Sequence, residues 1–171
     1  VVVRGGVQVG TGADLAGVWG QMEVVTGNAV QGAGGDISVA VGAGDTSDGG
    51  DVVVGAGYTS SASGKGGDVV VSAGASMLST GGDILMSSGV GSATSSGAVS
   101  IVSANAGTSG VSGAMTLSTG TSTAGTSGSI QLLTGEALSG SGGDVVVKVG
   151  AGDTGNGGQV SVEAGSTSSM Y

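Results

Sequence analysis

Aspartates at a regular spacing are the residues of this sequence that point most directly to chemistry. Asp36, Asp51, Asp68 and Asp83 follow one another at intervals of fifteen to seventeen residues, and Asp144 repeats their local sequence further along. If the intervening residues fold alike, these carboxylates form a column in which like charges repel unless something compensates them. One interpretation is an Asx-type structure, in which each carboxylate accepts hydrogen bonds from the amides of the glycines beside it.

Bound Ca²⁺ is an alternative interpretation of the same column, because hard cations take carboxylate and carbonyl oxygens. It makes Asp36, Asp51, Asp68 and Asp83 weak candidates for calcium ligands. The calcium-binding nonapeptide pattern is echoed only in part, and its period differs from the one seen here. A pair of carboxylates that cleaves glycosidic bonds is a third interpretation. Five copies of one residue favour an architectural role over a single active site.

The composition argues against an enzyme. The 171 residues include no His and no Cys, which removes the commonest general bases and metal ligands. No clustered set of acid, base and nucleophile is visible, so we expect no catalysis and no required cofactor. The formal net charge of −9 disfavours binding to nucleic acid and to anionic membranes. No run of residues is apolar for long enough to span a bilayer.

The aspartates belong to a repeat that runs through almost the whole chain. Each repeat carries Gly-Gly-Asp-Val-Val-Val or a variant of it, followed three residues later by Gly, as in residues 49–57. Positions are numbered here from the first residue of each repeat, so that Asp51 is at position 3. Self-similarity at a fixed period indicates structural modules that stack on their neighbours. The repeats begin at residues 19, 34, 49, 66, 81, 96, 112, 127, 142 and 157.

The pattern inside each repeat predicts a strand. Positions 4 and 6 are nearly always apolar and position 8 is smaller, which is the period-two alternation of a half-buried strand. Position 9 is Gly in all repeats but one, so we expect a bend with positive φ there. The rest of each repeat is small and polar. The sequence therefore predicts an all-β fold, a two-faced parallel β-solenoid (β-helix) with about 15 residues per coil.

The repeats also set the expected domain organisation. We expect residues 1–18 to form a partial coil with a longer loop, and residues 19–171 to form a ten-coil β-solenoid. Val1 enters a repeat in mid-strand, which indicates a segment of a longer repeat protein. Extra residues fall near residues 60–64 and near Gly110, within the polar stretch, and predict a tolerant turn there.

Apolar residues at positions 5 and 7 are the main clue to function, because these positions point away from the interior of such a solenoid. Scattered surface valines are common, but Val53, Val70 and Leu85 lie in consecutive repeats and predict a contiguous patch. A strand that is apolar on both faces is typical of burial on both faces. We interpret this face as an interface with another chain or another part of a longer one. Its predicted members are Val53, Val70, Leu85, Val102, Leu133 and Val146.

Repeats such as residues 103–113 and 149–158 resemble the Gly/Ser-rich β-solenoid repeats of large secreted or cell-surface proteins of algae and related protists. The resemblance covers nearly the whole chain. It implies an extracellular or cell-surface location, in filaments such as flagellar hairs or in wall and adhesive components.

Together these features favour a structural subunit of an extracellular filament or cell-surface assembly, built by stacking and lateral packing of β-solenoids. The expected partners are copies of the chain or other filament subunits, and the Ser/Thr-rich turns are candidates for O-glycans. An ice-binding solenoid is an alternative, although position 5 is too irregular for the ranks of Thr that ice binding uses. A carbohydrate-binding or adhesive surface is another, with Trp19, Tyr58 and Tyr171 as the aromatic residues able to stack on a sugar.

Overall fold

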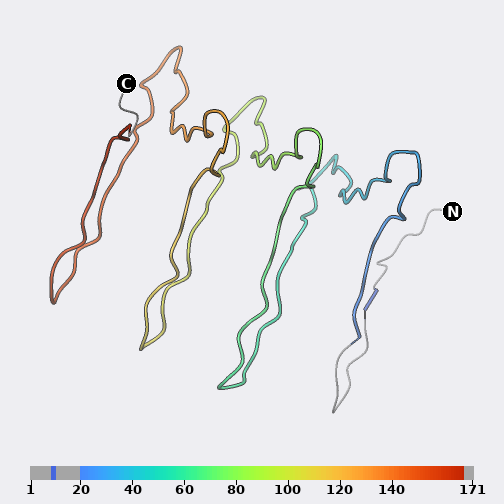
Figure 1. Ribbon diagram of the computed structural model, residues 1–171, viewed down its shortest axis with the longest axis horizontal. Helices are drawn as coiled ribbons and strands as arrows, with labels where there is room; N and C mark the ends of the chain where they lie inside the picture. The colour runs from blue at the N-terminus through green and yellow to red at the C-terminus, as the bar shows by residue number, and fades with distance from the viewer. Residues whose placement is uncertain (1–8, 11–19, 168–171) are drawn as a thin grey trace. The chain divides into compact units, whose positions relative to one another are not determined.

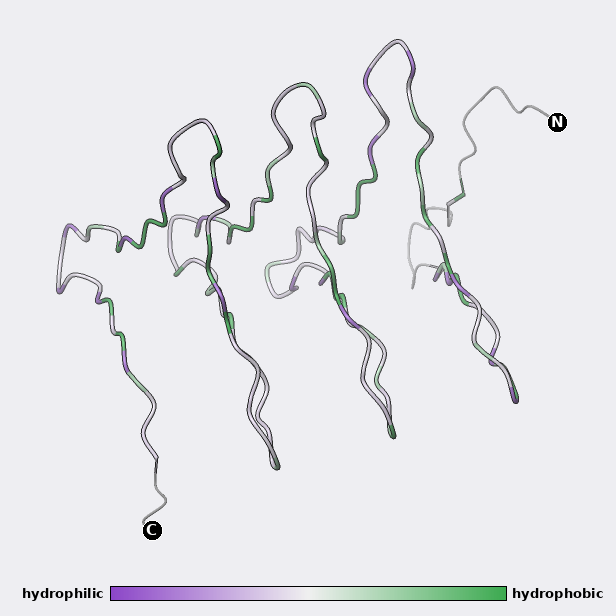
Figure 2. Ribbon diagram, turned by 90° about the horizontal axis from the view of Figure 1, so that it is seen from above, coloured by the Kyte–Doolittle hydropathy of each residue, from purple (hydrophilic) through white to green (hydrophobic). Residues whose placement is uncertain are grey.

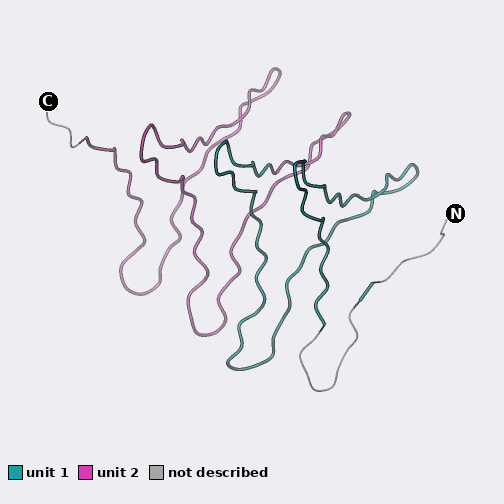
Figure 3. Cartoon of the chain, turned by 45° about the vertical axis from the view of Figure 1, so that its right-hand side comes forward, with its two compact units in different colours: residues 1–85 teal, residues 86–171 magenta. Residues whose placement is uncertain are grey.

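The computed structural model describes residues 9–10 and 20–167. In these residues extended stretches of backbone alternate with bends, and neither a helix nor a β-strand is formed (Figure 1). The chain divides into two compact units, Val1–Leu85 and Met86–Tyr171, which Figure 3 distinguishes by colour. Of the predicted first segment, residues 1–18, all but Val9 and Gly10 lies outside the described residues.

The prediction of an all-β, two-faced parallel β-solenoid is wrong for the described residues. A solenoid requires each coil to hydrogen-bond to residues about one full repeat earlier and later in the chain. Three of the four backbone bonds of the described residues instead join residues eight to ten positions apart, and the fourth lies within a turn. The chain therefore closes on itself within one repeat, and its extended stretches are left without a neighbouring strand. These bonds run from Gly67 N to Gly57 O, from Gly82 N to Gly74 O and from Gly97 N to Gly89 O, each at 2.9 Å.

Bends recur at the same place in every fully described repeat, in the polar stretch that follows position 9. Ser, Thr, Asp and Gly are frequent there, and these residues favour turns. The extra residues of the repeat that begins at Gly49 form a turn at residues 62–63, where Gly64 N donates to Ser61 O at 3.3 Å. Extra residues therefore lie in the bends, as the repeat lengths predict. The other bends are residues 30–32, 45–47, 77–79, 92–94, 108–110, 123–125, 138–140 and 153–155.

Between the bends, the apolar part of each repeat is extended. Its β-branched residues favour this conformation, and Figure 2 shows hydrophobic residues recurring along these stretches. Exposure alternates along the stretch, from 57% at Val52 to 89% at Val53 and 75% at Val54. No residue of the described part is buried, however. In this stretch the side chains at positions 4 and 6 are therefore less exposed than the one at position 5, as predicted. They do not form the interior that a solenoid would have.

The glycine at position 9 does not adopt the positive φ that its regularity predicts. Positive φ is found instead inside the bends, at Gly110, Gly125 and Gly155 with values of 132°, 129° and 80°, and at Gln31 with 62°. Three of these four residues are Gly, because a side chain is disfavoured in this part of backbone space. The bends, and not position 9, are thus where the described chain needs left-handed backbone.

Candidate functional site

The most regular contact in the described residues joins position 8 of one repeat to position 2 of the next. We call each such pair a neck, because it closes the loop that contains the bend. Position 8 supplies a small side chain, and position 2 supplies a Gly that lies against it. The necks pair Thr26 with Gly35, Val41 with Gly50, Ala56 with Gly67, Ala73 with Gly82, Ser88 with Gly97, Ser103 with Gly113, Thr119 with Gly128, Thr134 with Gly143 and Val149 with Gly158.

Hydrogen bonds reinforce several necks. At three of them the amide of the position 2 glycine donates to the carbonyl of the position 9 glycine of the preceding repeat, as from Gly67 N to Gly57 O. At the first neck a side chain takes part instead, because Thr26 Oγ1 donates to Gly35 O at 3.1 Å. Each loop is therefore closed at its base by one small contact and, at these four necks, by one hydrogen bond.

Close packing accounts for Gly at position 2 in three of the necks. A Cβ added to Gly50 would lie 2.7 Å from Cγ1 of Val41, and one added to Gly158 would overlap Val149. At Gly67 it would lie 3.1 Å from the amide nitrogen of Gly57. Real Cβ atoms keep a longer distance from their neighbours, since protein interiors and contacts leave little room for overlap. A larger residue would therefore force these three necks to shift, whereas at the other six an added Cβ would make ordinary contacts of 3.4 to 3.8 Å.

The neighbouring position 1 carries no such constraint. A Cβ on Gly49 would meet nothing within 4 Å, and position 1 is occupied by Trp or Ser in four repeats. Position 2, in contrast, is Gly in all ten repeats. Reasoning from the sequence concentrated on position 9 and missed position 2. The signal that could have found it is this invariance, set beside the variation at position 1.

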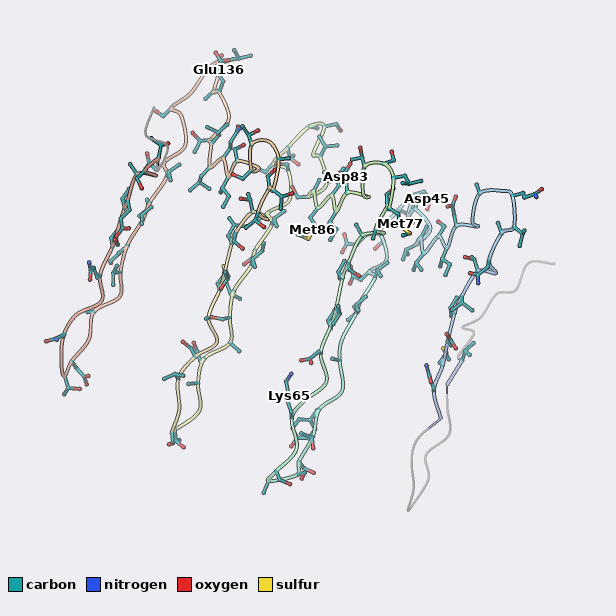
Figure 4. All side chains as sticks on the ribbon, viewed as in Figure 1. Asp45, Lys65, Met77, Asp83, Met86 and Glu136 are labelled. Atoms are coloured by element: carbon teal, nitrogen blue, oxygen red, sulfur yellow. The ribbon has the colours of Figure 1, made fainter. Side chains whose placement is uncertain are left out.

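The aspartates at position 3 do not make the Asx-type hydrogen bonds predicted for them. In the described part, Asp68 pairs with Lys65 instead, at 2.8 Å between Oδ2 and Nζ, and the two side chains are 64% and 79% exposed. Figure 4 labels Lys65, the last residue of its repeat, which precedes the extended stretch of the next repeat. No position 3 aspartate within residues 20–167, Asp68 included, accepts a hydrogen bond from a glycine amide.

The predicted calcium ligands are not gathered into one site by the described residues. No group of three or more acidic side chains lies close enough there to hold a metal ion. Asp36, Asp51, Asp68 and Asp83 each occupy the same position of a different repeat, all in the first compact unit. Calcium binding by these residues stays a prediction.

The six predicted interface residues are all well exposed. Their exposed fractions run from 77% at Val146 to 90% at Leu85. Val53, Val70 and Leu85 lie in the first compact unit, and the other three lie in the second. No hydrophobic core within the described residues gathers them. Their surfaces are therefore free for contacts with another molecule, and their role as an interface stays a prediction.

The rest of the described surface offers no enclosed site. No pocket is formed there. Tyr58, one of the three aromatic residues considered for sugar stacking, is 90% exposed in the loop of residues 56–67; Trp19 and Tyr171 lie outside the described residues. What the described chain presents is an open surface of hydroxyls, backbone groups and aliphatic side chains.

Comparisons with protein-family models, with curated proteins and with solved structures find no match for this chain. Within residues 9–10 and 20–167 there is also no helix of the length and apolar character that crossing a bilayer requires. The function must therefore be inferred from the chain's own repeat and from the surface it exposes.

Proposed function

We propose that this chain is a structural subunit of an extracellular filament or cell-surface assembly, held together by contacts between copies of the chain. The observation that carries the proposal is the exposed area. The chain exposes 17149 Å². A folded monomer of 15.5 kDa exposes only about 7,200 Å², and the same chain fully unfolded about 22,500 Å². Most of the surface that folding normally buries is thus still available for contacts with other chains.

An isolated chain with this surface lacks the burial that offsets chain entropy. Ordering one residue costs about 1–2 kcal/mol of backbone entropy, and fully burying one Val or Ile returns about 1.5–3 kcal/mol. Every large apolar side chain of the described residues remains at least 38% exposed. The missing stabilisation has to come from other molecules, so that order in this chain depends on association.

Copies of the chain are the partners that the repeat favours. Apolar residues recur at the same positions of every repeat, as Val52 to Val54 and Val69 to Val71 illustrate. Two copies therefore present apolar positions at the same spacing, and a match at one repeat brings the next repeats into register as well. A partner without this period would lose the match after one or two repeats.

Charge sets the conditions under which copies associate. Each copy carries a formal net charge of −9, so that copies repel one another at long range. Raising the ionic strength from 0.01 M to 0.15 M shortens the screening length from about 30 Å to about 8 Å. Association is therefore expected to strengthen as salt is added, which is opposite to the behaviour of complexes held by pairs of opposite charges.

The placement outside the cell rests on the resemblance of residues 103–113 and 149–158 to the secreted Gly/Ser-rich repeats of algae and protists. The exposed bends are rich in Ser and Thr, as in residues 121–126. Hydroxyls at such sites are accessible to the enzymes that add O-glycans, and the bends are the part of the repeat that tolerates extra bulk.

The test is sedimentation velocity over a wide range of protein concentration at low and at physiological salt, with circular dichroism of the same samples. We expect the sedimentation coefficient to rise with concentration and with salt, and an ordered spectrum to appear only in the associated fraction. Electron microscopy of that fraction should show regular particles or fibres. A compact monomer with an ordered spectrum at the lowest concentration would contradict the proposal.

A further inference from the structure

The last described bend, residues 153–155, is followed at once by an asparagine and a glycine. Asn156 is exposed, and Gly155 before it has a φ of 80°. A Cβ added to Gly157 would meet nothing within 4 Å, so no atom beyond its chain neighbours crowds that side of the Gly157 α-carbon. From this placement we infer that Asn156 is a modification site, at which the side chain deamidates spontaneously through a cyclic imide.

The chemistry needs no enzyme and no reactant besides water. The backbone nitrogen of Gly157 gives up its proton to solvent and attacks the side-chain carbonyl carbon, Cγ, of Asn156. The bond from Cγ to the amide nitrogen breaks, the nitrogen takes up a proton, and ammonia leaves. One water molecule then opens the five-membered ring. Opening at Cγ gives aspartate, and opening at the main-chain carbonyl gives isoaspartate, so that one water is consumed and one ammonia released.

The structure favours this reaction at Asn156 because the residue is exposed and no hydrogen bond among the described residues holds the two reacting groups. Ring closure requires the backbone to leave its ordinary conformation, which Gly allows more easily than any other residue. Within residues 20–166, neither the Asn156 side chain nor the Gly157 amide is held by a hydrogen bond. The nearest bond in the bend joins Thr154 Oγ1 to Asp153 Oδ1 at 3.4 Å, and it leaves Asn156 untouched.

The other two asparagines of the chain provide the comparison. Asn28 and Asn105 are each followed by Ala, and both are exposed like Asn156. A Cβ on the attacking residue hinders ring closure, so these two residues are expected to react several-fold more slowly. The difference among the three sites therefore comes from the residue that follows and not from access to water.

Deamidation at this place has a structural consequence. It adds a negative charge three residues after Asp153, and the isoaspartate product inserts a methylene into the main chain. The insertion falls two residues before Gly158, whose close contact with Val149 forms the last described neck. The extra backbone atom shifts Gly158 relative to Val149, so that modification is expected to open this neck while the other eight stay closed.

The experiment follows the three asparagines in one sample of the full-length chain. Trypsin cleaves after Arg4, Lys65 and Lys148, which gives three large peptides that contain one asparagine each. The protein is kept in warm neutral buffer, and samples are digested at intervals. Mass spectrometry then measures the gain that accompanies replacement of an amide by an acid, and enzymatic methylation of isoaspartate identifies the product. The variant Gly157→Ala is the matched control, since a Cβ fits there without a clash.

We expect the peptide with Asn156 to be modified several-fold faster than the other two, with isoaspartate among the products. Gly157→Ala should slow it to the rate at Asn105, and Asn156→Gln should remove it. Equal rates at all three asparagines, or an unchanged rate in Gly157→Ala, would overturn the inference. Because the three sites are read from the same molecules, differences in folding or association between samples do not affect the comparison.

Discussion

Among single residues, the two adjacent glycines that begin most repeats differ in the space available for a side chain. A Cβ on Gly49 would meet nothing within 4 Å, whereas one on Gly50 would meet Cγ1 of Val41 at 2.7 Å, so that Val41 would have to move. The same dipeptide thus combines a replaceable residue with one that the local packing requires. A count of glycines hides this distinction, since 41 residues of the chain are Gly and only some of them are fixed by contacts.

Gly50→Ala is expected to destabilise the ordered assembly by about 1–3 kcal/mol, because the added methyl group overlaps Val41. Gly49→Ala should be neutral or stabilising by about 0.4–1 kcal/mol, since it lowers the entropy of the unfolded chain without a clash. Denaturant unfolding of the associated protein measures both values.

The double variant Gly50→Ala with Val41→Ala provides the check on this explanation, because it removes the atom that the new methyl group meets. Coupling between the two changes should recover most of the lost stability. Equal losses in Gly49→Ala and Gly50→Ala, or no coupling with Val41→Ala, would show that the neck does not constrain position 2.

The ion pair of Lys65 with Asp68 is expected to matter little. Both side chains are mostly exposed, and exposed pairs contribute about 0–1 kcal/mol. Lys65→Met should therefore change the free energy of unfolding by less than about 1 kcal/mol, and high salt should abolish the difference from the unmodified chain. A loss of several kcal/mol that persists in high salt would indicate that Lys65 has a second role.

Among the elements, the length of a loop can change without changing the contact that closes its neck. The loop of residues 56–67 is longer than most of its counterparts by two residues and still closes at the pair of Ala56 and Gly67. Loop-closure entropy rises slowly with length, by about 0.6 kcal/mol for a doubling. The length of a loop is therefore free to vary as long as the positions on either side of the neck keep their order.

Insertion of two residues into the bend of residues 123–125 is expected to change the free energy of unfolding by less than about 1 kcal/mol. Insertion of one residue between Leu117 and Ser118 should be much more damaging, because it reverses the alternation of the side chains and moves Thr119 away from Gly128. Thermal unfolding of the two variants, followed by circular dichroism, compares them. Equal sensitivity at both places would contradict the separation of loop from neck.

The sequence predicted the repeat, the alternation in the apolar stretches and the turn in the polar stretch, because each depends on residues close together in the chain; the bend expected at position 9 is absent from the described residues. It did not predict which residues meet. A fixed period indicates that repeats are alike, but it does not decide whether a repeat pairs with its neighbour or closes on itself. Positive φ was also expected at position 9, as at Gly57, whereas glycines such as Gly125 and Gly155 inside the bends adopt it.

For the whole molecule, the exposed apolar residues and the large surface area both show that the chain by itself buries little of its surface. The outward side chains of Val53, Val70 and Leu85 are between 82% and 90% exposed, and burying them requires a second molecule. Stability and association are then a single equilibrium, and the midpoint of unfolding depends on protein concentration.

The triple variant Val53→Ser, Val70→Ser and Leu85→Ser is expected to raise the concentration needed for association on the order of 100-fold, if each change removes about 1 kcal/mol of burial. The control changes position 5 residues that are already polar, as Ser38→Thr, Ser100→Thr and Ser161→Thr, and should leave association within a few-fold of the unmodified chain. Sedimentation velocity measures both. A triple variant that associates as well as its control would place the interface elsewhere.

The neck also bears on how the gene can change. Each neck joins the end of one repeat to the start of the next, so that deletion of one whole repeat brings together the same two positions from different repeats. Removal of residues 49–65, for example, would place Val41 opposite Gly67 with the same kind of contact. Unequal recombination that adds or removes whole repeats therefore keeps the contact between position 8 of one repeat and position 2 of the next. The number of repeats can vary between alleles or species while the local packing is preserved.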